Sequence, residues 1–111
     1  MRLVLYVAEA GLRSTLVARL TFGGADVATV RDLTSYRLSP RRRAVLVADA
    51  TGVSAYPGGT AALCADPRWS RLVVLTDVPR PEGAPPHLHH LRRADADATL
   101  PALLDAWRRE A

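Results

Sequence analysis

The sequence predicts an α/β fold of three layers, with a five-stranded parallel sheet between helices. Three observations favour this fold: apolar runs without polar alternation, helical segments between those runs, and short links. Apolar runs that lack alternation are typical of strands buried on both faces. Strands that alternate with helices indicate a parallel sheet whose crossovers are right-handed.

Two strands and one helix are expected at the start of the chain. Residues 2–7 (RLVLYV) are apolar after Arg2, show no polar alternation and predict the first strand. Leucines recur every four residues from Leu12 to Leu20, which predicts an amphipathic helix that ends at Gly23. Residues 25–30 predict the second strand.

A short helix and the central strand are expected next. Asp32 can cap a helix over residues 33–38, which Pro40 ends. Residues 44–48 (AVLVA) are wholly apolar and predict the third strand, with Asp49 at its tip.

The following segment is predicted to contain a loop, a short helix, a strand and a second loop. Thr51 and Gly52 are expected to begin the first loop, and residues 60–65 to form the helix. Residues 71–75 (RLVVL) predict the fourth strand. Residues 76–86 (TDVPRPEGAPP) hold four prolines and are predicted to lack a helix, because proline has no N–H and clashes with the preceding turn.

A fifth strand over residues 88–92 and a final helix complete the expected elements. Asp97 can cap this helix, and Pro101 falls in its first turn, where proline is tolerated. Its apolar face follows i, i+3, i+4, i+7 spacing through Leu100, Leu103, Leu104 and Trp107. We therefore expect the strand order 2-1-3-4-5 of the flavodoxin-like fold, in a single domain over residues 1–111.

Composition indicates a globular cytoplasmic protein without membrane association. Hydrophobic residues make up 49% of the chain and charged residues 23%, both ordinary for a globular protein. The apolar runs are too short to span a bilayer, and the N-terminus lacks a full signal-peptide pattern. Cys64 is the single cysteine and can form no internal disulfide, which fits a reducing compartment.

The net charge is +4, and every basic residue is an arginine. Lys, Asn, Gln and Ile are absent, so we interpret the arginines as the codon usage of a GC-rich bacterium. Nucleic-acid binding through residues 41–43 and 92–93 is the alternative interpretation. We do not favour it, because the few aromatic residues do not interleave with the arginines as a stacking surface requires.

Four stretches resemble, in order, parts of the receiver domains of bacterial response regulators. Residues 12–27 (LRSTLVARLTFGGADV) are similar to the first helix, turn and second strand of a receiver. Residues 45–49 (VLVAD) are similar to its third strand, and residues 72–76 (LVVLT) to its fourth. Residues 93–104 (RADADATLPALL) are similar to the stretch that follows the family's lysine and opens the last helix.

The resemblance implies a pocket in which carboxylates hold Mg²⁺ while a hydroxyl and a lysine stabilise a transferring phosphoryl group. Asp49 takes the place of the phospho-acceptor, and Thr76 that of the hydroxyl. The family's acidic pair is reduced to Glu9 at most, which makes Glu9 and Asp49 the candidate metal ligands. Arg93 takes the place of the lysine. We therefore expect no phosphorylation and no cofactor, with Mg²⁺ needed only if Asp49 is phosphorylated.

Other side chains carry expectations of their own. Asp49 is expected to cap a loop or to pair with Arg93. His87 and His89 would share one face of the fifth strand and form at most a weak metal pair. Trp69 is expected to be a partly exposed lid.

We predict a stand-alone receiver-like module for signalling or regulation that is not an enzyme and binds a protein partner or a second copy. An apolar stripe left by the missing fourth helix would supply the binding surface. One alternative is a phosphorylatable single-domain response regulator that uses Asp49. The other is a flavodoxin-like ligand-binding or enzyme-accessory subunit, with a pocket around Glu9, Asp49 and Thr76.

Overall fold

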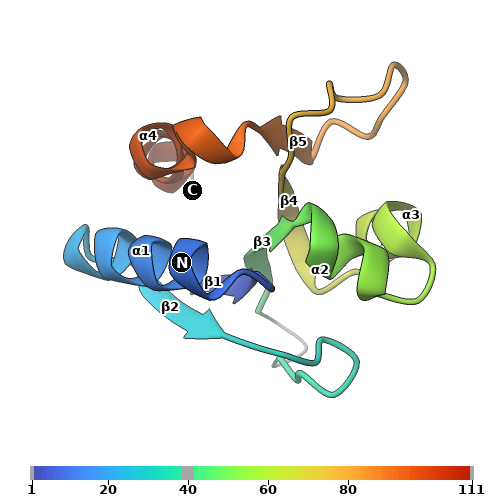
Figure 1. Cartoon of the computed structure of the whole chain (residues 1–111), viewed down its shortest axis with the longest axis horizontal. Coiled ribbons are helices and arrows are strands. Elements are labelled where there is room, and N and C mark those ends of the chain that lie inside the picture. Colours follow the sequence, from blue (N-terminus) through green and yellow to red (C-terminus); the bar gives the residue numbers. More distant parts are fainter. Residues whose placement is uncertain (1, 39–41, 111) are drawn as a thin grey trace.

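A five-stranded parallel sheet forms the middle layer of the computed structural model, which describes residues 2–38 and 42–110 (Figure 1). The strands run in the order β2-β1-β3-β4-β5, which confirms the predicted flavodoxin-like topology. Their bounds are β1 (Arg2–Tyr6), β2 (Asp26–Thr29), β3 (Ala44–Asp49), β4 (Trp69–Leu75) and β5 (Leu88–Leu91). The predicted helix stop at Pro40, and Arg41 of the arginine run, lie outside the described residues.

Helices cover both faces of the sheet. One face carries α1 (Ala10–Phe22) and α4 (Ala96–Glu110), and the opposite face carries α2 (Ala50–Ala55) and α3 (Gly59–Ala65) (Figure 1). A short 3₁₀ turn, η1 (Arg93–Asp95), leads into α4. As predicted, the leucines of α1 and α4 and the side chain of Trp107 pack into the core between these two helices and the sheet.

The sheet separates two apolar cores, because successive side chains of a strand point to opposite faces. On β3, Val45 and Val47 face α1 and α4, whereas Leu46 and Ala48 face α2 and α3. Every residue of β3 is buried, as expected for the central strand of a parallel sheet. Each fully buried leucine or valine side chain stabilises the fold by about 2 kcal/mol relative to an exposed one.

Loops replace helices at two places on the face that carries α2 and α3. The proline-rich segment 76–87 has no helix, as predicted, and the guanidinium of Arg80 binds the carbonyl oxygens of Ala84, Pro85 and Leu88. The predicted helix over residues 33–38 is wrong, since this segment forms bends and irregular backbone.

The segment after β2 is irregular because side chains compete for its backbone groups. Asp32 accepts hydrogen bonds from the amide and hydroxyl of Thr34 and from the hydroxyl of Ser35, which form a local turn. Leu33 nevertheless fills the core at 1% exposure. Arg68 holds the segment in place by donating to the carbonyl oxygens of Leu33 and Tyr36, both at 2.6 Å.

Four further expectations are wrong. Thr51 and Gly52 begin no loop, because both lie in α2. Helix α4 starts at Ala96, so Asp97 lies inside its first turn and not at its N-cap, and Pro101 falls beyond that turn. Trp69 is no exposed lid: it is 1% exposed and stacks on Tyr36, with the ring centroids 6.4 Å apart.

Within the described part of the chain, every helix is too short or too polar to cross a membrane.

Candidate functional site

Asp49 is the one buried charged side chain among the described residues, and its carboxylate is bound entirely by backbone amides. Oδ2 accepts hydrogen bonds from the N–H groups of Ala8 at 3.0 Å and Glu9 at 3.2 Å. Oδ1 accepts one from Gly52 at 2.7 Å and so caps α2. Asp49 was expected to cap a loop; it caps the helix α2 instead, and the same carboxylate holds the loop between β1 and α1.

Gly52 allows this arrangement because it has no side chain. A Cβ atom at this position would lie 2.8 Å from the carbonyl oxygen of Tyr6 and 2.9 Å from Oδ1 of Asp49. Real Cβ atoms do not approach other atoms this closely, so any larger residue would push α2 away from the end of β3. The short hydrogen bond from Gly52 to Asp49 therefore depends on the glycine.

The chemistry around Asp49 differs from that of a magnesium site. Mg²⁺ is held by oxygen ligands, whereas the groups that face the Asp49 carboxylate here are N–H donors. Glu9, the other candidate ligand, directs its carboxylate to the guanidinium of Arg93. The described residues contain no cluster of three or more His, Cys, Asp or Glu side chains that could hold a metal ion.

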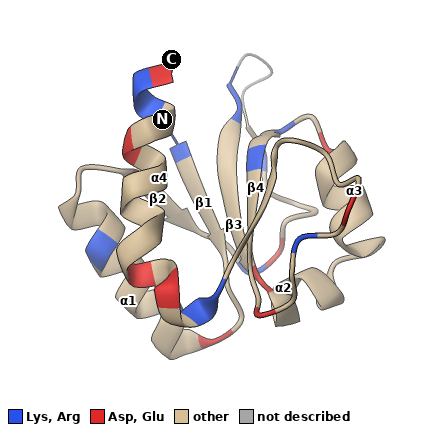
Figure 2. Cartoon of the chain, turned by 90° about the horizontal axis from the view of Figure 1, so that it is seen from above, with Lys and Arg blue, Asp and Glu red and all other residues tan. Residues whose placement is uncertain are grey.

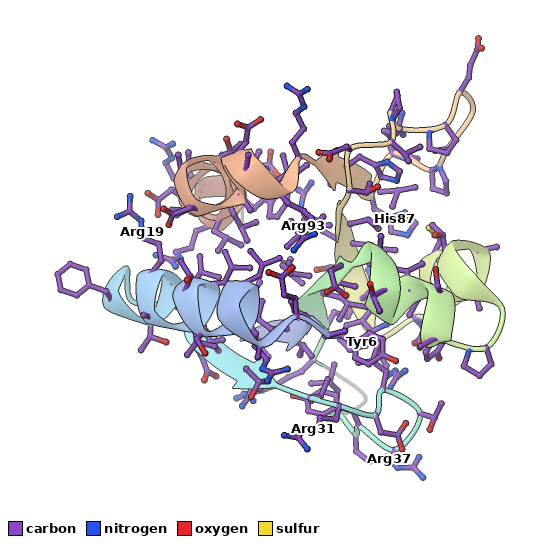
Figure 3. All side chains as sticks on the ribbon, viewed as in Figure 1. Tyr6, Arg19, Arg31, Arg37, His87 and Arg93 are labelled. Carbon is purple, nitrogen blue, oxygen red and sulfur yellow. The ribbon has the colours of Figure 1, made fainter. Side chains whose placement is uncertain are left out.

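Arg93 pairs with Glu9, so the predicted ion pair between Arg93 and Asp49 is wrong. Figure 3 shows Arg93 extending from the segment before α4 toward α1. The side chains of Arg93 and Glu9 are 48% and 52% exposed, so water screens the pair and it stabilises the fold by at most about 1 kcal/mol. The pair links the N-cap of α1 to η1, the turn that leads into α4.

Thr76 lies at the same edge of the sheet, one residue beyond Leu75, which pairs in register with Asp49. Its hydroxyl accepts a hydrogen bond from the amide of Val78 at 3.2 Å, and its own amide donates to Leu91. Thr76 therefore shapes the start of the proline-rich segment. It also lines an open cavity of about 560 Å³ between this segment, β5 and α4.

His87, just before β5, and His89, within it, have separate partners. Nε2 of His87 lies 3.1 Å from the carbonyl oxygen of Cys64 in α3, as its direction in Figure 3 indicates. His89 packs on Trp107 of α4, with the ring centroids 5.0 Å apart. The expectation that His87 and His89 share a face is therefore wrong. Burial lowers the pKa of His89, and the charges of Arg71, Arg80 and His87 lower it further.

Charges of both signs are mixed over the molecule (Figure 2). Ion pairs join Arg2 to Asp26, Arg19 to Asp97, Arg68 to Asp66 and Arg71 to Glu110. Arg43, the last residue of the arginine run 41–43, donates to the carbonyl oxygens of Pro67 and Trp69. These arginines therefore have partners within the fold.

A second cavity, of about 390 Å³, lies beside Asp49 and was not among the predicted sites. It is lined by Tyr6, Val7, Ala8, Arg13, Val30, Arg31, Thr51, Gly52 and Ala55. The predicted strand order could have located this cavity. The second strand is added on one side of the first strand and the third strand on the other, and such a switch point is the usual ligand crevice of an open α/β sheet.

Comparison of the chain with family models, with curated proteins and with solved structures finds no match.

Proposed function

We propose that this protein is a receiver-like interaction module that is not phosphorylated on Asp49. The observation that carries the proposal is the set of three backbone N–H groups that bind the Asp49 carboxylate. An acceptor carboxylate must present a free oxygen to the phosphoryl group, with a metal ion beside it. Both oxygens of Asp49 are instead used to hold the β1–α1 loop and α2.

The neighbouring residues support the same proposal. Glu9 would have to leave Arg93 to become a metal ligand. Arg93 is a broad, planar cation that prefers bidentate contacts, and it serves poorly as the mobile point charge that a lysine provides. Restoring the phosphoryl site would therefore require the backbone donors and this ion pair to rearrange together.

The face with α2 and α3 supports the interaction part of the proposal. Between α3 and the proline-rich segment lies an open groove of about 470 Å³, where the missing fourth helix was expected to leave an apolar surface. Its lining is mostly small and apolar: Thr60, Ala61, Cys64, Ala65, Pro81, Ala84, Pro85 and Leu88. We propose that a protein partner packs on this groove, because contiguous apolar surface of this kind marks interaction sites.

Incubation with acetyl phosphate and Mg²⁺, followed by intact mass measurement, tests the phosphorylation part of the proposal. We expect the mass to stay unchanged. An adduct of one phosphoryl group that disappears in Asp49→Ala would overturn the proposal and favour a working response regulator.

Light scattering tests whether the partner is a second copy. A dimer that dissociates in Ala61→Arg, a substitution at an exposed position in the groove, would identify the partner as this chain itself. A monomer at high concentration would restrict the proposal to a different protein.

A further inference from the structure

The cavity beside Asp49 has the position and the lining of a ligand site. From these features we infer that it binds a small organic anion, a carboxylate or phosphate monoester with an apolar body. It lies at the carboxyl ends of β1 and β2 and against α2, where β1 pairs with β2 on one side and with β3 on the other. Its volume of about 390 Å³ falls within the range of small-molecule sites. This inference does not depend on whether Asp49 can be phosphorylated.

Positive charge in the lining selects an anion. Arg13 and Arg31 both line the cavity, whereas its lining contains no carboxylate. One nitrogen of Arg13 donates to the carbonyl oxygen of Val7 at 3.0 Å, which fixes the side chain and leaves further N–H donors of the guanidinium available. Arg31 is exposed and extends from the segment that follows β2 (Figure 3).

The carboxylates close to the cavity in sequence have other partners. Asp49 is bound by backbone amides, and Glu9 by Arg93. Asp32 accepts from Thr34 and Ser35, whose hydrogen bonds hold its pKa below the usual value. Arg13 and Arg31 therefore bring positive charge to a lining that holds no carboxylate, which favours an anionic ligand.

The remaining lining residues select an apolar body. Val7, Val30 and Ala55 contribute aliphatic surface, and Tyr6 contributes an aromatic ring that reaches the first turn of α2. Thr51 adds one hydroxyl. A planar or aliphatic group can pack between these side chains while its anionic end meets the guanidinium groups.

Four probes measured by amide NMR separate these contributions: phenyl phosphate, phenylacetate, benzyl alcohol and inorganic phosphate. We expect one or both aromatic anions to shift the amide signals of Ala8, Arg31 and Thr51 in a saturable way, and the comparison between them shows whether phosphate or carboxylate is preferred. Benzyl alcohol should bind about tenfold more weakly, because it makes no charge-assisted hydrogen bond. Inorganic phosphate should also bind more weakly, because it lacks the apolar body.

Arginine variants locate the site. Arg31→Gln should weaken binding of the aromatic anion about tenfold, and Arg13→Gln at least as much. Arg37→Gln is the matched control, because Arg37 is an exposed arginine on the same loop that does not line the cavity (Figure 3). Arg31→Gln keeps the test valid if Arg13→Gln disturbs the fold, since Arg31 is exposed.

Three outcomes would overturn the inference. They are an absence of saturable shifts with either aromatic anion, equal binding of benzyl alcohol, and unchanged binding in Arg31→Gln. Equal binding of inorganic phosphate would overturn the apolar part of the ligand. None of these outcomes bears on the mass measurement with acetyl phosphate, so the two proposals fail separately.

Discussion

The side chain of Asp49 joins the start of α2 to the β1–α1 loop, whose residue Ala8 lies 41 positions before Asp49. Its burial costs free energy unless its oxygens are hydrogen-bonded, and three backbone amides meet this need. The amides also depend on the carboxylate, because its removal would leave them without their acceptor. Asp49, whose position resembles that of a phospho-acceptor, therefore holds the β1–α1 loop and α2 together.

Asp49→Ala should lower the free energy of unfolding by about 3 kcal/mol, because three hydrogen bonds to a charged group are lost and the amide of Gly52 stays buried without an acceptor. Asp49→Asn should cost less, since its amide oxygen still accepts one or two of these bonds. Urea denaturation measures both values, with exposed Asp77→Ala as the matched control. A stability equal to that of the control would show that the amides do not depend on Asp49.

His89 makes stability depend on pH near neutrality. Because its pKa is lowered in the folded protein, the unfolded chain binds the proton more readily below the ordinary value of 6.5. Stability should therefore be highest above pH 6.5 and fall as the pH drops through the window below it. His89→Phe keeps a ring against Trp107 and should flatten this dependence, measured as urea midpoints between about pH 7.5 and 5. An equal slope in both proteins would contradict the prediction.

The sequence predicts where Asp49 lies better than it predicts the residue's partners. An acid at the end of an apolar run is visible in the sequence, and so is its place at the carboxyl edge of the sheet. The pairing of Arg93 with Glu9 instead of Asp49 depends on η1, which sets the direction of Arg93 before α4 begins. No local pattern specifies that direction.

At the scale of elements, β1, β3 and β4 are predicted well because each holds an apolar run whose burial fixes its place. Two short segments are predicted wrongly, the loop at Thr51 and Gly52 and the helix over residues 33–38, because in each the residues favour both a helix and a turn. Asp49 is a good N-cap, but Gly52 in the next turn favours a loop by propensity. The amide of Gly52 bonds Asp49 at the start of α2, and the close approach of Tyr6 requires a glycine there. Asp32 is also a good N-cap, yet the hydroxyl groups of Thr34 and Ser35 turn the chain locally instead.

Two glycines in helices should respond oppositely to the same substitution. Gly11 lies in α1 with open space around it, so Gly11→Ala should stabilise the protein by about 0.5 kcal/mol through helix propensity. Gly52→Ala should destabilise it by about 1–3 kcal/mol, because its Cβ would press on Tyr6 and Asp49. Thermal or urea unfolding measures both. Stabilisation by Gly52→Ala would show that α2 can move away from the sheet at little cost.

At the scale of the whole molecule, the two apolar cores share the five strands that separate them. A residue pair such as Leu46 and Val47 contributes to both cores from one strand, so neither core can lose its order while the other keeps the sheet. The two tryptophans report on the two faces separately, since Trp69 lies with α2 and α3 and Trp107 with α1 and α4.

Single-tryptophan proteins should therefore show one cooperative transition on both faces. In Trp69→Phe, the fluorescence of Trp107 should follow the same urea curve as circular dichroism, and in Trp107→Phe the fluorescence of Trp69 should do so. Each comparison is made within one variant, so a general loss of stability does not affect it. Fluorescence that changes before circular dichroism in either protein would show that one face opens independently.

The all-parallel pairing of the sheet also has a consequence for how the chain reaches its native state. Each described strand pair joins residues that are far apart in sequence, such as Leu72 with Leu88 and Arg2 with Ala44. Parallel neighbours cannot be joined by a tight hairpin, so a long chain segment must close before the first ladder hydrogen bond forms. Folding should therefore be slow compared with that of helical proteins of similar size, because the loss of chain entropy precedes the gain from strand pairing.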